Sequence, residues 1–445
     1  MGDAERLRDE AVELLRLLIA CDTSNPPGRE VQAAAVLEEY LGAAGVECER
    51  VAKDPDRPNL VARLRGRGGG PSLAFLGHLD VVHARREDWS VDPFAAVERD
   101  GAIWGRGAVD MKSQVAATAV ALAHLARERF RPNGDVMLIL TADEEVGEAG
   151  VGAPFLVEAR PDLRPDYVVG EGAGERIETA HGPIYLLDCG VKASAPATLT
   201  VHGTAADASL PGNGESALDE LARLLARLER HEPPRRVRPE LLPLLDAVAP
   251  GDGDLEERVA RARAAHPALD AIVGALTQTV VAVTTVETQA SSNIVVDRAV
   301  ATLYCAIVPF TTREELEREL RDALGPGRYE LEVSEPNGGD LVSPGDTPLS
   351  RAIRGFLAEH DPQARLVPAL GFGFSDCHVM REAYGAVAYG FIPFRHADPM
   401  TNLTTKHAVD EHVLVDDLVF QVQAALHVAR EVGGAVRPAA AAAAS

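Results

Sequence analysis

The sequence lacks several features that would each point to a particular class of protein. Its five cysteines are scattered and form no C-x-x-C pair, which disfavours a disulfide framework and favours a reducing compartment. No uncharged apolar run approaches the length of a membrane span. The net charge is 44 − 68 = −24, which argues against nucleic acid and anionic membranes as partners. The first residues, MGDAERLRDE, show no basic-then-apolar signal pattern, so a cytoplasmic protein is expected.

What the sequence does contain is a long alternation of strand and helix patterns. A chain of 445 residues suggests two domains rather than one. Strands and helices that alternate predict an α/β fold with a mostly parallel sheet and helices on both faces. In such sheets ligands gather at the carboxyl ends of the strands. The periodicity predicts helices over 4–20, 29–44, 112–128 and 413–431, and strands over 59–65, 72–77, 135–141 and 166–170.

The pattern changes near residue 195, where ATLTVHG alternates like an antiparallel strand. We expect an inserted α+β unit over 195–336, between a first part of the main domain at 1–194 and a second part at 337–434. The low-complexity residues 435–445 are expected to be disordered. Within the insertion the pattern predicts strands over 197–203, 279–287, 299–308 and 328–334, and helices over 215–230, 238–276 and 312–323.

The motif GHLDVV, residues 77–82, follows a short buried strand and places His78 and Asp80 two residues apart. In an extended segment, residues i and i+2 point to the same side, so this imidazole and this carboxylate can face one target. A histidine supported by a carboxylate is a common arrangement at zinc sites. One H-x-D motif is weak support on its own.

Four more motifs follow in order, each where a strand should end or a helix begin. They supply an aspartate in GRGAVD, adjacent acids in TADEE, a glutamate in VVGEG and a histidine in TTKHAVDE: Asp110; Asp143, Glu144 and Glu145; Glu171; His407. Each alone is more often a core histidine or a solvated acid than a ligand. Together, two imidazoles and three carboxylates suit two zinc ions, with one carboxylate bridging. A remaining carboxylate can then serve as the base that takes a proton from water.

With these motifs, the chain resembles the dinuclear zinc amidohydrolases and metallopeptidases, which include aminoacylase, succinyl-diaminopimelate desuccinylase, acetylornithine deacetylase, glutamate carboxypeptidase and related dipeptidases. The resemblance runs from TSNPPG to HAVDE and so covers nearly the whole chain. It implies two Zn²⁺ ions, with Co²⁺ or Mn²⁺ as alternatives, and a small peptide or N-acylamino acid as substrate. It also implies that the inserted unit is a lid of the kind through which such proteins form homodimers.

The same resemblance implies the roles of individual residues. His78 and Glu171 would bind one zinc, and Glu145 and His407 the other. Asp110 would bridge the two ions, and the Asp110–Met111 peptide would be cis. Two further roles complete the site: Asp80 would orient His78, and Glu144 would be the general base.

Two positions in the lid depart from the family pattern. Asp207 stands where the family usually has a histidine that polarises the substrate carbonyl, and Ala306 stands where it usually has an arginine that holds the substrate carboxylate. An ionised acid cannot donate a hydrogen bond to a developing oxyanion. Asn293 matches the pattern as a substrate-binding residue. Arg395 and His396 are either replacement donors for the substrate or ordinary surface charges.

Three functions remain open on the sequence alone. The first is a dizinc hydrolase of amide or peptide bonds with a divergent lid. The second is a metal-retaining binding protein without catalysis, which the presence of Glu144 disfavours. The third is a biosynthetic enzyme that uses the metal pair for acyl transfer or a lyase step, with Asp207 as a candidate catalytic acid.

Overall fold

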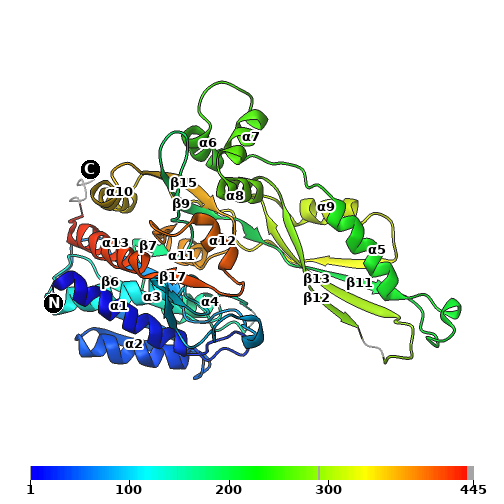
Figure 1. The fold of residues 1–445 in the computed structure, drawn as a ribbon, viewed down its shortest axis with the longest axis horizontal. Helices are drawn as coiled ribbons and strands as arrows, with labels where there is room; N and C mark the ends of the chain where they lie inside the picture. The colour runs from blue at the N-terminus through cyan, green and yellow to red at the C-terminus, as the bar shows by residue number, and fades with distance from the viewer. Residues whose placement is uncertain (1, 148, 289–290, 438–445) are drawn as a thin grey trace, which may run out of the picture.

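The computed structural model of the chain describes residues 2–147, 149–288 and 291–437. The described chain forms a layered α/β body from which a narrower sheet with its own helices projects (Figure 1). Residues 438–445 of the predicted disordered tail lie outside the described residues. No helix in the described ranges is long and apolar enough to cross a membrane.

The body is built on a largely parallel sheet, which confirms the α/β prediction. Strands β6, β3, β7 and β16 pair in parallel with one another, as do β9 and β15, whereas the pairs β1–β2, β2–β6 and β16–β9 are antiparallel. In the described chain the spatial order of the strands is β1 (Glu47–Val51), β2 (Asn59–Leu64), β6 (Val136–Thr141), β3 (Leu73–His78), β7 (Tyr167–Gly170), β16 (Val387–Gly390), β9 (Ile184–Val191) and β15 (Arg365–Gly371), with β8 (Arg176–Ile177) paired to β9.

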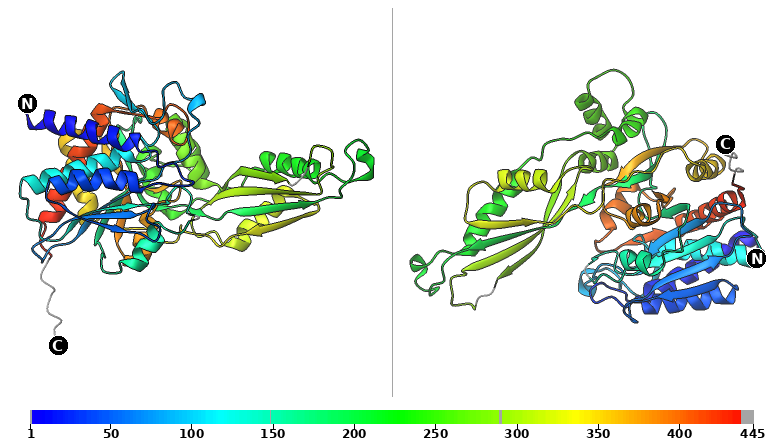
Figure 2. Two further views of the ribbon diagram at one scale, coloured as in Figure 1. Left: turned by 90° about the horizontal axis from the view of Figure 1, so that it is seen from below. Right: turned by 180° about the vertical axis from the view of Figure 1, so that it is seen from behind.

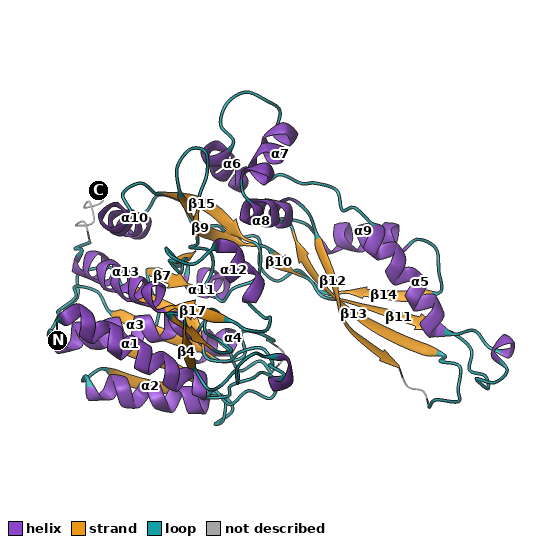
Figure 3. Cartoon of the chain, in the orientation of Figure 1, coloured by secondary structure: helices purple, strands orange, loops and turns teal. Residues whose placement is uncertain are grey.

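Helices cover both faces of this sheet (Figure 3). They do so because the strands carry apolar side chains on both faces, and these must be buried. Phe75 of β3 faces one layer and Leu76 the other. The first layer contains α1 (Asp3–Ala20), α2 (Val31–Ala43), α3 (Lys112–Arg127), α10 (Pro348–His360) and α13 (Val415–Gly434). The second contains α4 (Ala153–Ala159) and α11 (Cys377–Tyr384).

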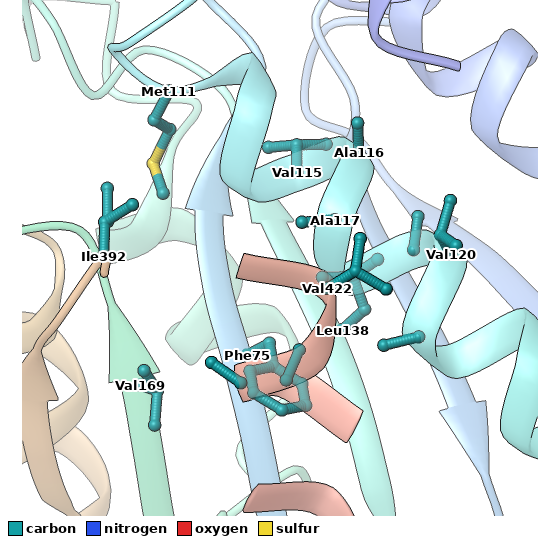
Figure 4. Close-up of a cluster of buried hydrophobic side chains, with 14 of the residues drawn as sticks. Phe75, Met111, Val115, Ala116, Ala117, Val120, Leu138, Val169, Ile392 and Val422 are labelled. Carbon is teal, nitrogen blue, oxygen red and sulfur yellow. The ribbon is translucent and has the colours of Figure 1, made fainter. Parts of the chain in front are cut away.

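The helix α3 is the centre of the larger layer. Its sequence is rich in alanine, so it packs closely between the sheet and the outer helices, and every residue from Lys112 to Leu125 is buried. Figure 4 shows Val120 of α3 in one cluster with Phe75 and Leu138 of the sheet and Val422 of α13. This packing places the first turn of α3 against the ends of the strands.

The projecting unit is the predicted α+β lid. Its antiparallel sheet contains β10 (Ala193–Ser194), β13 (Arg298–Ile307), β11 (Ala197–His202) and β14 (Tyr329–Val333), and β12 (Val280–Thr288) pairs with β13. The helices α5 (Ala217–Arg230) and α9 (Arg313–Leu324) pack on one face of this sheet through a separate apolar cluster. Figure 2 shows that the lid extends away from the body in both further views.

The segment predicted as one helical stretch, 238–276, differs from that prediction. It forms three short helices, α6 (Leu242–Val248), α7 (Leu255–Ala265) and α8 (Pro267–Thr277). The breaks have local causes: Asp254 caps the start of α7 through the Glu257 amide, and Pro267 begins α8. These helices pack against β9 and β15 of the body, not on the lid sheet. By packing, this part of the inserted sequence belongs to the body.

A small three-stranded sheet brings two distant segments of the chain together. Its strands are β4 (Val97–Arg99), β5 (Ala102–Trp104) and β17 (His412–Leu414), and β17 pairs with β5. The last helix before β17 is α12 (Pro399–Thr405). Because β17 lies beside β5, the segment with His407 lies next to the loop with Asp110, although about 300 residues separate them in sequence.

Candidate metal centre

The five proposed metal ligands lie at the ends of three strands and next to two helices. His78 is the last residue of β3, Glu145 follows β6 and Glu171 follows β7. Because these three strands are parallel neighbours, their carboxyl ends meet at one edge. Asp110 lies two residues before the start of α3, with a cis Asp110–Met111 peptide as expected, and His407 follows α12.

The structure brings the five side chains into two groups that share Asp110. In the first group, His78 Nε2 lies 3.1 Å from Asp110 Oδ1 and 3.5 Å from Glu171 Oε2. In the second, His407 Nε2 lies 3.4 Å from Asp110 Oδ2 and 2.9 Å from Glu145 Oε2. Each oxygen of Asp110 therefore faces one imidazole. The ligand atoms within each group all lie within 4.8 Å of one another.

The electrostatics of this cluster fit a pair of divalent cations. Burial and then the charge of Asp110 raise the pKa of Glu145 to about 7. Its Oε1 atom is buried without a hydrogen-bond partner in the described chain. Hydrogen bonds that the His407 ring donates to the carboxylates of Asp110 and Glu145 raise the pKa of His407 to about 10. A bound cation would reduce the repulsion among these carboxylates and would give the buried oxygen a partner. Imidazole and carboxylate ligands of this kind suit zinc.

Metal affinity is expected to rise with pH between about 6 and 9. Without metal, His407 holds a proton up to pH about 10, and Asp110 and Glu171 likewise raise the pKa of His78 although burial opposes this. A metal needs the neutral imidazole, so binding must release these protons, and affinity should rise about tenfold per pH unit for each proton released. Zinc calorimetry in buffers of different ionisation enthalpy counts the protons; a pH-independent affinity would contradict this expectation.

Asp80 lies behind the site, but its carboxylate makes no hydrogen bond to the His78 ring, so its role in orienting His78 remains a prediction. The ring atom His78 Nδ1 lies 3.0 Å from the backbone oxygen of Asp80 and 3.7 Å from the carboxylate, which is too long for a hydrogen bond. The carboxylate instead accepts the backbone N–H groups of Glu144 and Glu145, at 3.2 and 3.1 Å. Asp80 thus positions the loop that presents both glutamates.

The three adjacent acids after β6 point to different surroundings. Asp143 is turned into the body, where its carboxylate accepts hydrogen bonds from Asn25 and the Gly150 amide. Asn25 also donates to Asp80 at 2.9 Å, so the SNPPG turn supports the same loop. Glu145 faces His407, whereas the carboxylate of Glu144 has no hydrogen-bond partner in the described chain. Glu144 is therefore the acid left free beside the two groups of ligands.

Burial, followed by the charge of Glu171, raises the pKa of Glu144 well above its usual value. Asp376 is a further acid nearby that the sequence analysis missed. It accepts a hydrogen bond from Thr141 at 2.7 Å, and burial raises its pKa to about 7. Its place just before α11, in the SDCH segment, carried no spacing signal in the sequence.

Glu411 was also missed, although it lies in the HAVDEHV motif. Its fully buried carboxylate accepts hydrogen bonds from the backbone N–H groups of Gly107, Val109 and Asp110. It also forms an ion pair with Arg106, whose Nη1 atom lies 2.6 Å away. These four bonds hold the loop that carries the shared aspartate. The only signal in the sequence was an acid four residues after the proposed ligand His407.

The lid residues lie away from these ligands. Asp207 is exposed, and its carboxylate accepts two hydrogen bonds from Ser209, which lower its pKa. The Ala208 amide donates to the backbone oxygen of Asn293, so Asp207 and Asn293 lie together in the lid. Among the described residues, neither contacts the metal-ligand candidates of its own chain. Their proposed roles remain predictions.

Arg395 and His396 lie in the loop between β16 and α12 and pack against α13. Asp417 accepts both of their backbone N–H groups, at 2.7 and 2.8 Å. The guanidinium of Arg395 lies 5.8 Å from the ring centre of Phe420, and the His396 ring meets the same phenylalanine edge-on. This placement gives no support to a substrate role, which remains a prediction.

Known proteins resemble this chain in both sequence and fold. The model of peptidase family M20/M25/M40 matches residues 74–431. Succinyl-diaminopimelate desuccinylase from Parvibaculum lavamentivorans is 37% identical over 232 residues, which cover 50% of this chain and 54% of that protein. The chain thus spans about half the length of the curated relatives it matches.

Solved structures share the fold over nearly the whole chain. The M20 family metallo-carboxypeptidase Sso-CP2 from Sulfolobus solfataricus matches with a TM-score of 0.72 and 19% identity, covering 97% of this chain and 99% of that one. Human carnosine dipeptidase 1 matches with a TM-score of 0.72 and 16% identity, covering 97% and 98%. At these identities the likeness establishes the body-and-lid fold alone.

Proposed function

The chain belongs to peptidase family M20/M25/M40, and from that membership we propose that it is a dizinc hydrolase of an amide or peptide bond in a small peptide or N-acylamino acid. The observation that carries the proposal is the position of Asp110 between His78 and His407, with Glu144 unpaired beside them. His78 and Glu171 would hold one ion, Glu145 and His407 the other, and Asp110 both.

Bound metal ions would polarise the substrate carbonyl and lower the pKa of the attacking water. The residues of the chain supply the proton transfers and the alignment. Glu144 takes the proton of the water and returns it to the leaving nitrogen, because it is the acid of this loop that neither belongs to the ligand groups nor, like Asp143, is turned into the body. Asp80 and Asn25 keep the loop with Glu144 in place through the hydrogen bonds described above.

The usual substrates of the family carry a free carboxylate. The altered lid supports a substrate that lacks this group. Ala306 offers no charge to such a group, and the lowered pKa of Asp207 keeps that residue anionic and unable to donate a hydrogen bond. The same lowered pKa removes the reason for assigning Asp207 as a catalytic acid in a lyase or transferase. No observation on the described residues favours a non-hydrolytic or non-catalytic role.

The proposal is tested with zinc-loaded protein on a panel of dipeptides and N-acylamino acids, each as the free acid and as the C-terminal amide. Mass spectrometry identifies the products. Cleavage of amides at least as fast as acids is expected, because Ala306 provides no cation for a carboxylate. Absence of any cleavage with two metals bound would overturn the hydrolase proposal.

The proposal also includes a homodimer through the lid, zinc as the native metal and a cytoplasmic location. The lid edge supports self-association, since Val280, Val283 and Val286 of β12 are exposed apolar residues. In the described chain β12 pairs with β13 on one side only. An unpaired apolar edge strand is a ready surface for a second copy.

Replacing Asp207 by histidine is expected to raise hydrolysis of ordinary dipeptides by up to about 10²-fold, because it restores one oxyanion donor. Asp207 lies in the lid away from its own metal ligands, so the new donor would serve the partner's site in a dimer. The measurement is kcat on free-acid dipeptides for Asp207→His and for Asp207→Ala, which removes the charge without adding a donor. Equal rates for the two variants would count against this account of the lid.

A further inference from the structure

The loop after β6 that presents Glu144 and Glu145 contains a residue in an unusual backbone conformation. Asp143 has a φ of 58°, in the left-handed region that residues other than glycine seldom adopt. Such conformations persist only where the surrounding structure fixes them, and they gather at functional sites. The contacts of Asp143 therefore decide how this glutamate loop (residues 142–147) is held.

Arg57, two residues before β2, is the cation that faces Asp143. Its guanidinium is buried, and its Nη2 atom lies 3.5 Å from Asp143 Oδ1. The same Nη2 atom lies 2.6 Å from Oε1 of Glu30, a fully buried acid, and Nε lies 3.0 Å from Oε2 of Glu30. Glu30 Oε1 in turn accepts the backbone N–H of Asp143 at 3.3 Å. Arg57 and Glu30 thus hold both the side chain and the backbone of Asp143.

The SNPPG turn makes room for this guanidinium. Gly28 has a φ of 74°, and a Cβ atom there would lie 2.2 Å from Arg57 Nε, so any other residue would collide with the guanidinium. Asn25 of the same turn donates to the Asp143 oxygen that Arg57 faces, at 3.0 Å. The SNPPG turn therefore forms one buried network with Arg57 and Asp143.

The buried acids of this network depend on one cation. In the described chain the ion pairs of Glu30 and Asp143 are both with Arg57, and both acids are buried. An arginine stays charged in proteins, and its planar fork can contact two carboxylates at once. Without Arg57, the Asp143 carboxylate would lose the charge that keeps it turned into the body, beside two glutamates of the same sign.

We propose that Arg57 is a positioning residue for hydrolysis, which fixes the glutamate loop through Asp143 so that Glu144 and Glu145 face the two groups of ligands. This inference rests on the proposed hydrolase function. Arg57 transfers no proton and acts only through the loop. Its effect on rate is indirect but large, because a displacement of about 1 Å in a reacting group can cost about 10²-fold.

The first test is Arg57→Met, which removes the charge and fills much of the same space. At saturating zinc we expect kcat on the best substrate of the panel to fall by about 10²-fold with KM within about twofold, because the base acts in the transition state. Arg57→Lys keeps a cation and should be at least about tenfold faster than Arg57→Met. The matched control is Arg63→Met on β2, since Arg63 pairs with Asp135 instead. Its kcat should stay unchanged.

A second variant separates positioning from stability. Arg57→Met leaves Glu30 as a buried anion without a partner, which destabilises the fold, whereas Arg57→Met combined with Glu30→Gln removes both charges of the pair. The midpoint of urea unfolding should return towards that of the unchanged protein in this double variant. Its kcat should stay low, because Asp143 still lacks its cation. A kcat that recovers together with the stability, or one that is unchanged in Arg57→Met, overturns the inference.

Hydrogen exchange followed by mass spectrometry tests the loop without any turnover. The amides of residues 142–145 are all hydrogen-bonded to buried side chains, so their exchange reports whether the loop keeps its place. In the double variant this segment should exchange at least about tenfold faster while α3 stays unchanged. If the unchanged protein cleaves nothing, the hydrolase proposal fails, while the exchange rates still decide whether Arg57 fixes the loop. Equal exchange of the loop, or faster exchange of α3 as well, overturns the inference.

Discussion

Glu144→Ala is expected to reduce hydrolysis by at least about 10²–10⁴-fold while both metal ions remain bound. Its carboxylate has no partner in the described chain and lies outside both groups of ligands, so removing it should not disturb metal binding. General acid–base catalysis typically accounts for a rate factor of this size. The measurement combines kcat on the best substrate of the panel with the metal content by mass spectrometry.

The neighbouring Glu145→Ala is the matched comparison. Glu145 lies 2.9 Å from His407, so this variant should lose one of its two metals. Opposite results for the two variants, with metal lost from Glu144→Ala and retained by Glu145→Ala, would mean that the roles of the two glutamates are exchanged. A Glu144→Gln variant, which keeps the shape without the basicity, should be as inactive as the alanine variant.

Glu411→Ala is expected to lower the free energy of unfolding by about 3–5 kcal/mol, the usual cost of breaking a buried ion pair by removing one partner. The change leaves the buried guanidinium of Arg106 without its anion. It also leaves three backbone N–H groups of the Gly107–Asp110 loop without their acceptor. Because this loop carries Asp110, zinc affinity should fall as well.

Urea unfolding followed by circular dichroism measures the stability, and zinc calorimetry measures the affinity. Glu431→Ala is the control, since Glu431 is an exposed acid on α13. Its stability should stay within about 0.5 kcal/mol of the unchanged protein, as is usual for surface substitutions. A Glu411→Ala variant as stable as this control would show that the Asp110 loop does not depend on the carboxylate.

The prediction of the α/β fold with its lid rested on local patterns. Buried strands such as Leu73–His78 read as apolar runs, and lid strands such as Ala197–His202 alternate between apolar and polar residues. Short strands without such a run, and the division of 238–276 into three helices that pack on the body, were not evident. Those outcomes depend on which apolar surfaces of the central sheet other elements leave uncovered, and only the tertiary structure shows this.

By itself, the sequence determined the family, the α/β fold and the ligand types, because a ligand's chemistry is a property of the residue and its motif. His78, Asp110 and His407 could be named in that way. Only the tertiary structure decided that Asp80 holds the glutamate loop and that Glu411 holds the Asp110 loop. These relations join segments tens to hundreds of residues apart, and no spacing along the chain encodes which buried polar group meets which.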